Sequence, residues 1–485
     1  MNNKFIKHFL VIGGGTFISM IIGFLTTPII TRIVNPIEYG QYSIFTMYSS
    51  MALMVLCLGL DQAMVRFFYE QETLEYRRGL LLKCLKYPIC GALIVSALVM
   101  CLSMTGLIQF ELGSKALVVL CVYTIAQIIY RFSQLLVRLQ YKSKLYSFLG
   151  IVQKSIYVIV ALLLIYIGFW DNTFSLEVAT FFAIIVCVII SICAEKQFWS
   201  FNKVEEKHCL ISEKELIKYA YPYVFSMGVT TLFQYADKMA LNIYCSYEEV
   251  GIYSSTMTLV HVFAIIQTTF NTLWAPMAVE HYSKDQNEKT FYQKGNQIIT
   301  VIMFFIGLSL ILCKDVFSLL LGEKYREAAY ILPFLIFNPI MYTISETTVN
   351  GLVFKKKSNM QVLVSVGACL VNVIGNALLV PRLGCQGAAI STGVSYIGFW
   401  ALRTFLSNKY FYVDFHLKKF AVITLITVLY AFYNTFVKFN ICTVLGYFGC
   451  LIVLVVLYFD TVRWSLNYVL VTVKNIFERK QHCIK

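Results

Sequence analysis

Ionisable side chains interrupt several long apolar segments of this 485-residue chain. If those segments cross a membrane, each charge near the bilayer centre costs at least about 2.5–3.5 kcal/mol, so it tends to face a cavity or a partner. Carboxylates and imidazoles in such places can exchange protons or cations, whereas Arg and Lys can bind anions. The most prominent of these residues are Asp61 with Arg66, the adjacent Asp237 and Lys238, His261, and Glu346.

The spacing of these residues predicts how they pair. Asp61 and Arg66 are either an ion pair at the cytoplasmic end of a helix or separate groups that face a cavity. Neighbouring residues on a helix point about 100° apart, so Asp237 and Lys238 are each expected to find a different partner or to face the cavity. His261 is either a proton carrier or a hydrogen-bonded packing residue.

Two further cations, Arg131 and Lys154, lie nearer the predicted cytoplasmic ends of their segments, where long side chains can extend to the interface. The 15 cysteines include no CxxC pair and no Cys/His cluster at metal-ligand spacing. No P-loop follows the glycines at 13–15. We therefore predict no catalytic residue, no metal and no cofactor.

The segments that must position these residues are helices that cross a membrane. The chain is 59% hydrophobic and 14% charged, against roughly 45–50% and 25% in soluble domains. Its apolar segments are apolar on both faces and reach the roughly 20 residues that a spanning helix needs. We predict an all-α polytopic membrane protein with about fourteen transmembrane helices, near residues 7–31, 41–65, 81–105, 115–137, 145–168, 174–195, 216–244, 250–280, 295–313, 326–353, 359–380, 386–407, 418–437 and 441–463.

The positive charge of the chain predicts its orientation. With the N-terminus inside, most of the 40 Lys and Arg fall on the cytoplasmic side, as the positive-inside rule requires. Both termini are then cytoplasmic. The net charge of +14 is explained by this topology, so we predict contact with membrane lipid and no nucleic-acid partner.

A nine-residue phrase occurs twice, at 35–43 and 246–254, with Glu, Gly, Tyr and Ser in register. The copies open the second and eighth predicted spans, so the repeat interval is six spans and the two halves keep the same orientation as parallel repeats. Two such lobes can rock about a central cavity, which favours a transporter. The predicted parts are an N-terminal lobe over 1–195, a cytoplasmic linker over 196–215, a second lobe over 216–407, two further spans over 408–463 and a basic tail over 464–485.

Five segments in this order carry a family resemblance: 23–43, 59–68, 236–241, 249–254 and 383–391. They resemble the polysaccharide-biosynthesis flippases of the multidrug/oligosaccharidyl-lipid/polysaccharide exporter superfamily, and within it the O-antigen and capsule repeat-unit flippases. The resemblance covers essentially the whole chain. It implies movement of an undecaprenyl-diphosphate-linked oligosaccharide across a bacterial inner membrane, with membrane lipid and other proteins of polysaccharide assembly as partners.

The resemblance also suggests roles for the charged residues. A diphosphate needs cationic ligands, and the fork of Arg fits phosphate oxygens best. The candidates for binding it are Arg32, Arg66, Lys238, Arg131 and Lys154. Without a nucleotide-binding motif, ion exchange is the expected source of energy, with Asp61, Asp237, His261 and Glu346 as the candidate carriers.

Three alternatives remain at this stage. A multidrug exporter of the same superfamily is expected to have about twelve spans, so spans thirteen and fourteen speak against it. A lipid II flippase would share the fourteen spans, but the first two spans contain fewer Arg than such a substrate would lead us to expect. A membrane glycosyltransferase or polymerase would need a large extramembrane loop, whereas the longest predicted loop has about twenty residues.

Overall fold

The computed structural model describes residues 3–107, 109–199, 211–464 and 467, and the regular structure among them is entirely helical. Of the helices in this part of the chain, nine are long and apolar enough to cross a membrane, or up to eleven if two bent helix pairs each count as one span. Every one of the fourteen predicted spans lies on one or more helices. The predicted all-α polytopic fold is therefore confirmed.

The backbone contacts divide the chain into unit 1, Met1–Ser255, and unit 2, Thr256–Lys485. This boundary follows the second copy of the repeated phrase, whereas the sequence-based prediction places a linker at 196–215. The core of that linker, 200–210, and most of the basic tail lie outside the described residues. The division into two six-helix lobes stays a prediction.

Unit 1 is a bundle in which α6 packs against α1 and α7, while α5 packs against α2, α4 and α7. Helix α8 packs against α2 and α3. The helices of this unit are α1 (Asn3–Ile33), α2 (Pro36–Cys57), α3 (Leu60–Phe67), α4 (Leu74–Met104), α5 (Gly113–Leu139), α6 (Ser143–Ile167), α7 (Asn172–Ala194), α8 (Glu213–Tyr244) and the first nine residues of α9 (Tyr247–His261).

The second predicted span is broken in two. Leu58 and Gly59 both adopt left-handed backbone conformations, and α3 turns away from α2 by 53°. A Cβ on Gly59 would lie 2.6 Å from the carbonyl oxygen of Ala220 on α8, so a larger residue would strain the bend. The bend lets the short α3 pack against α4, α5 and α8, which places Asp61 inside the bundle.

Unit 2 packs α14 against α10, α11 and α16, and packs α13 against α16 and α17. Helices α17 and α18 pack against each other, and α18 also contacts α11. The elements of this unit after α9 are α10 (Ala264–Lys284), α11 (Thr290–Leu312), α12 (Lys314–Leu320), the 3₁₀ turn η2 (Glu323–Tyr325), α13 (Ala328–Leu335), α14 (Phe337–Thr348), α15 (Asn350–Phe354), α16 (Ser358–Asn408), α17 (Leu417–Phe436) and α18 (Ile441–Leu457).

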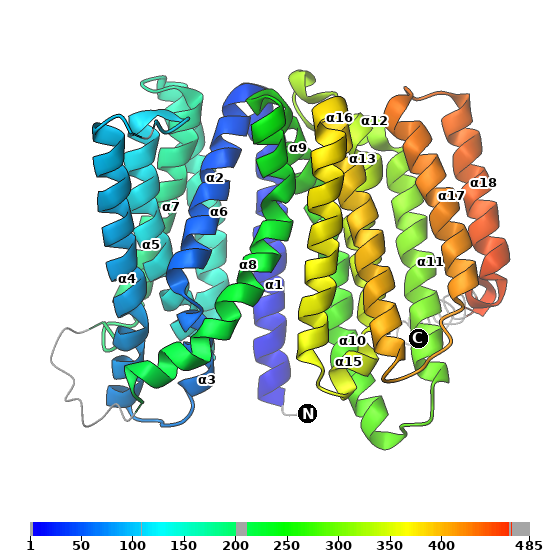
Figure 1. Ribbon diagram of the computed structural model, residues 1–485, viewed down its shortest axis with the longest axis horizontal. Helices are drawn as coiled ribbons and strands as arrows, with labels where there is room; N and C mark the ends of the chain where they lie inside the picture. Colours follow the sequence, from blue (N-terminus) through cyan, green and yellow to red (C-terminus); the bar gives the residue numbers. More distant parts are fainter. Residues whose placement is uncertain (1–2, 108, 200–210, 465–466, 468–485) are drawn as a thin grey trace, which may run out of the picture. The chain divides into compact units, whose positions relative to one another are not determined.

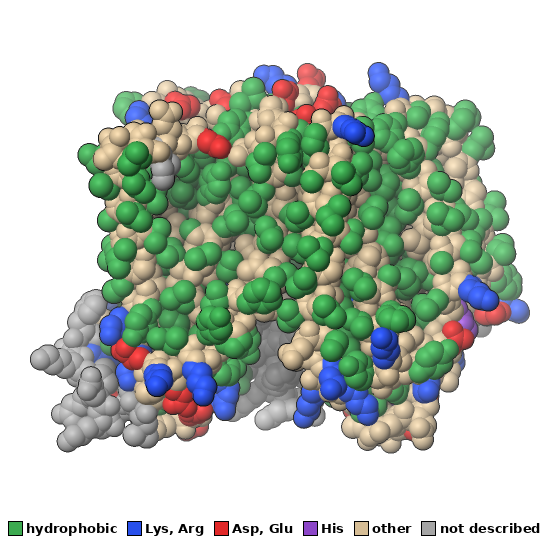
Figure 2. Space-filling view, in the orientation of Figure 1, with side chains coloured by type: hydrophobic (Ala, Val, Ile, Leu, Met, Phe, Trp, Pro, Cys, Tyr) green, Lys and Arg blue, Asp and Glu red, His purple; other side chains and the backbone are tan. Residues whose placement is uncertain are grey.

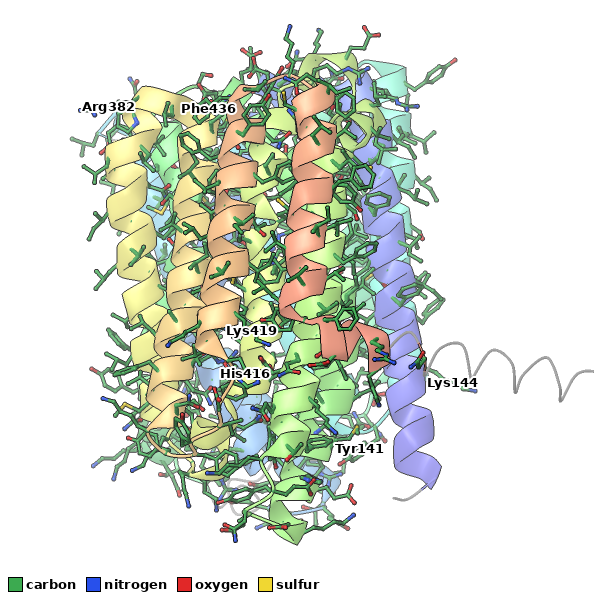
Figure 3. All side chains as sticks on the ribbon, turned by 90° about the vertical axis from the view of Figure 1, so that its right-hand side faces the viewer. Tyr141, Lys144, Arg382, His416, Lys419 and Phe436 are labelled. Carbon is green, nitrogen blue, oxygen red and sulfur yellow. The ribbon has the colours of Figure 1, made fainter. Side chains whose placement is uncertain are left out.

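The long α16 contains the eleventh and twelfth predicted spans as two halves. Gly384, at φ 54° and ψ −134°, breaks the helix, and Ser391 in the second half donates to the carbonyl of Asn372 in the first at 2.8 Å. The halves therefore run antiparallel. Figure 3 shows Arg382, beside the break, at the same end of unit 2 as Phe436, while His416 and Lys419 lie at the other end.

The side chains on the visible surface are sorted as a bilayer requires. Figure 2 shows hydrophobic side chains over the middle of the helices and charged side chains gathered at the helix ends. This distribution agrees with spans whose polar ends meet water and whose flanks meet lipid. The chain is a multi-pass membrane protein.

Candidate functional site

The two copies of the repeated phrase contact each other within unit 1. A Cβ on Gly40 would lie only 1.8 Å from the carbonyl oxygen of Tyr247, and one on Gly251 only 2.0 Å from that of Pro36. Each clashing carbonyl lies four residues before the glycine of the other copy. The first turns of α2 and α9 thus pack backbone against backbone, and the two contacts are related by a local two-fold axis. Only glycine leaves room for so close an approach.

One turn farther along, Lys238 from α8 joins this contact. Its Nζ donates to Ser43 Oγ at 2.7 Å, and Ser43 in turn donates to Ser254 Oγ at 2.7 Å. Asp237 Oδ2 instead accepts a 2.5 Å hydrogen bond from the hydroxyl of Tyr253. The prediction that Asp237 and Lys238 have different partners is confirmed.

A second polar cluster joins α3 to α5. Arg131 Nη2 lies 2.8 Å from Asp61 Oδ2, and the side-chain amide and backbone N–H of Gln62 also donate to the same carboxylate, at 3.1 and 3.0 Å. The Asp61 side chain is 2% exposed, whereas the Arg131 side chain is 47% exposed. The buried Asp61 carboxylate therefore holds the guanidinium of Arg131, whose side chain is about half exposed.

The ion pair considered between Asp61 and Arg66 is wrong. Arg66 pairs with Glu70 at 3.2 Å, and both side chains are exposed. The bend at Leu58–Gly59 explains the difference, because it starts a new short helix on which Asp61 faces the bundle and Arg66 faces outward. The sequence offered no such signal, since the partner of Asp61 lies 70 residues away.

The cluster of Asp61 and Arg131 suits the binding of a phosphate group. Arginine has five N–H donors, and the hydrogen bond to Asp61 uses one of them. The exposed donors can engage phosphate oxygens, while Asp61 fixes the direction of the fork. Among the described residues, Asp61 and Arg131 form one polar position between α3 and α5, and Lys238 with Ser43 forms another between α8 and α2.

Unit 2 contains its own buried pair. Arg403 Nη1 lies 2.8 Å from Glu346 Oε1 and 2.6 Å from Ser345 Oγ, and its guanidinium stands over the rings of Tyr342 and Phe399. Both charged side chains are about nine-tenths buried. This geometry holds α14 to the second half of α16.

Three further predicted site residues are exposed. Arg32 is exposed at the end of α1 and Lys154 is exposed on α6, and neither has a hydrogen bond or ion pair among the described residues. His261 is exposed at the end of α9. The structure therefore brings together Asp61 with Arg131, but none of the other predicted phosphate ligands joins them.

Sequence reasoning missed four buried charges. Glu195 pairs with Lys142 at 2.5 Å, and Lys314 donates to the carbonyl of Val437 at 2.9 Å. Lys314 lies between two predicted spans, and burial lowers its pKa. Arg403 and Glu177 are the other two, and Glu177 had a usable signal, since it is the only charged residue between 172 and 194.

Comparison with known proteins places this fold. The family model described as "polysaccharide biosynthesis protein" matches residues 5–280. CapF of Staphylococcus aureus, a capsular polysaccharide biosynthesis protein, is 22% identical over 84% of this chain and 99% of its own. Agl15 of Haloferax volcanii, a probable low-salt glycan biosynthesis flippase, is 21% identical over 44% of this chain and 45% of its own.

Two solved structures share the fold. The lipid II flippase MurJ in an inward closed conformation superposes with a TM-score of 0.69 at 14% identity, over 95% of this chain and all of that one. An inward-facing multidrug resistance transporter of the MATE family and the MOP superfamily has a TM-score of 0.57 at 12% identity, over 80% of this chain and 94% of that one. Since the family model covers more than half of the chain, the chain belongs to the polysaccharide biosynthesis protein family.

Proposed function

We propose that this protein is a flippase that moves a lipid-linked oligosaccharide from the cytoplasmic to the outer leaflet of a bacterial inner membrane, with both of its termini in the cytoplasm. Membership of the polysaccharide biosynthesis family is the observation that carries this proposal. The glycan-related names of CapF and Agl15 and the fold shared with MurJ support it. Such reorientation makes and breaks no covalent bond, so it needs no catalytic residue.

The substrate is proposed to be an undecaprenyl-diphosphate-linked repeat unit, and Arg131 is its principal phosphate ligand. Arg131 is half-exposed yet fixed by the buried Asp61, so it loses little side-chain freedom when it binds. Lys238 is a second ligand, held by Ser43. Arg32, Arg66 and Lys154 are exposed cations that can attract the anion but are not positioned in the same way.

We also propose that exchange of an ion drives the movement. Among the four candidates, Asp61 and Glu346 are each paired with an Arg, so their carboxylates already have a cationic partner. Asp237 has a neutral phenol at 2.5 Å and is the better proton or cation carrier. His261 remains the candidate from α9.

Deletion of the protein from its host tests the function directly. We expect one lipid-linked repeat unit to accumulate on the cytoplasmic leaflet, with loss of the surface polymer. If no lipid-linked sugar accumulates and the cells instead become sensitive to amphiphilic cations, the protein exports drugs and the proposal fails.

Reconstitution tests the ligand assignment. Proteoliposomes that contain the accumulated lipid-linked glycan should show its transfer to the outer leaflet with the wild-type protein and with the surface variant Glu280→Gln. Arg131→Gln should reduce the initial rate at least tenfold. A wild-type rate for Arg131→Gln would remove Arg131 from the phosphate site.

A further inference from the structure

A cavity of about 330 Å³ opens within unit 1 at the end opposite Arg131. It is bounded by α2, by the start of α5 with the segment before it, and by the start of α7 with the turn before it. Ala116 lines it, and Arg131 lies fifteen residues farther along the same helix, which corresponds to about 22 Å. In the predicted topology this end is on the outer side of the membrane. The volume falls at the lower end of the roughly 300–1,000 Å³ of ligand pockets, which suits one small ligand.

Glu177 is one of three acidic residues that line this cavity. The residue is 1% exposed, and neither of its carboxylate oxygens has a hydrogen-bond partner in the structure. A buried polar group without a partner is rare, and an unpaired buried carboxylate is costly. Glu177 has no part in the phosphate site, and a ligand in the cavity that it lines would supply the missing donors.

Aromatic residues line one part of the cavity. Trp170 and Phe174 both line it, with ring centroids 5.3 Å apart in an edge-to-face arrangement, and Phe169 packs against Trp170 in the same manner at 5.4 Å. Trp170 is partly exposed. A flat aromatic face beside hydrogen-bonding groups complements a sugar ring, which presents C–H groups on one face and hydroxyl donors at its edge.

Other polar residues that line the cavity already have hydrogen-bond partners. Gln41 accepts from the hydroxyl of Thr173 at 2.9 Å, and Glu111 accepts from Asn242 and Tyr247 at 3.1 and 3.2 Å. These contacts tie the wall to α2, α8 and the start of α9. Gln41 and Glu111 thus have partners within the protein and help to fix the shape of the cavity.

The charges of the wall select among ligands. Glu111, Asp171 and Glu177 outnumber Lys115, so a phosphate would meet a net negative surface. Within the described part of the chain, no three acidic, His or Cys side chains are close enough together to hold a metal ion. A neutral sugar, or one that carries an amine, satisfies both the aromatic wall and the buried carboxylate.

We propose that this cavity is a saccharide-binding site that takes a neutral or amino sugar ring on the outer side of unit 1. The proposal rests on the proposed function in one respect: the sugar is taken to belong to the glycan of the transported lipid. Stacking on Trp170 and hydrogen bonds to Glu177 hold the ring, about 22 Å along α5 from the phosphate ligand Arg131. The glycan and the diphosphate would then be bound at different ends of the same unit.

Saturation-transfer NMR on the full-length protein in nanodiscs tests the site, with N-acetylglucosamine and glucosamine as the probes. We expect saturable binding to the wild-type protein. Trp170→Leu should weaken binding about tenfold or more, equivalent to about 1.4 kcal/mol. Trp170→Tyr should retain most of it, and Glu177→Gln should weaken binding less than Glu177→Leu.

Tyr166→Leu is the matched control, since Tyr166 is an exposed aromatic at the same end of unit 1 that does not line the cavity. It should bind both probes as the wild type does. Thermal melting of every variant separates loss of binding from loss of fold. Absence of saturable binding to the wild type, or equal binding by a folded Trp170→Leu, overturns the site.

The transport assay separates this proposal from the proposed function. If the wild type flips the lipid-linked glycan but binds neither probe, the saccharide site is wrong and the function stands. If the wild type binds the probes, loses them with Trp170→Leu and moves no lipid-linked glycan, the site stands and serves a free sugar instead. If Trp170→Leu lowers both probe binding and the rate of flipping, the sugar is that of the substrate.

Discussion

Ser43 donates a 2.7 Å hydrogen bond to Ser254, although 211 residues separate them. They are the last residues of the two copies of one phrase, and the glycines three residues earlier in each copy make reciprocal backbone contacts. Lys238 donates to the same Ser43 hydroxyl. The two copies of the phrase therefore contact each other in the folded unit. Lys238, a candidate substrate ligand, is hydrogen-bonded to this contact.

The glycine contact should tolerate no side chain. Gly40→Ala and Gly251→Ala each force a Cβ to within about 2 Å of a carbonyl oxygen, and relief requires the helices to shift at a cost of about 1–3 kcal/mol or more. We expect both variants to melt at clearly lower temperature in detergent than the wild type. Gly398→Ala, where nothing lies within 4 Å of the added Cβ, is the control and should melt as the wild type does.

Variants of the Asp61–Arg131 pair should affect stability and transport differently. Arg131→Gln leaves the buried Asp61 carboxylate without its cation, which we expect to cost about 1–3 kcal/mol because Arg131 itself is half-exposed. The double variant Asp61→Asn with Arg131→Gln should recover most of that stability and none of the flipping activity. Thermal melting and the proteoliposome assay measure the two effects. Recovery of transport in the double variant would contradict a phosphate-binding role for Arg131.

Tyr253→Phe removes the hydroxyl that donates to the buried Asp237 carboxylate while keeping the ring. If Asp237 carries the coupling ion, the variant should shift the pH dependence of the flipping rate with little change in expression. Tyr244→Phe, at an exposed tyrosine on the same helix as Asp237, should leave the profile unchanged. A wild-type profile for Tyr253→Phe and also for Asp237→Asn would remove Asp237 from coupling.

The buried pair in unit 2 should be structural. Glu346→Gln leaves Arg403 about nine-tenths buried with a neutral partner, and we expect a loss of about 3–5 kcal/mol if the pair is broken and less if the amide still accepts the hydrogen bond. The exposed pair Glu280 with Lys284 provides the comparison, because Glu280→Gln should change stability by less than about 1 kcal/mol. Equal melting of Glu346→Gln and Glu280→Gln would show that the buried pair contributes nothing.

The break inside α16 shows what a pattern can and cannot predict. The helical breaks at 381–385 and between α1 and α2 coincide with Pro or Gly next to polar residues, and both were predicted from the sequence. The bend at Leu58–Gly59 was missed, because the apolar run continues through it and a single Gly is common inside membrane helices. That bend decides which way Asp61 and Arg66 point.

The amino-acid sequence by itself determined that this chain is helical, polytopic and internally repeated, because hydropathy, length and the recurrence of a phrase are local properties of the chain. It also showed that Asp237 and Lys238 need different partners, because a helix turns about 100° per residue. Only the tertiary structure decided that Asp61 holds Arg131, that Glu346 holds Arg403 and that Glu177 faces a cavity. Those relations join residues tens of positions apart, and which of several equivalent charges meet depends on how helices bend and pack.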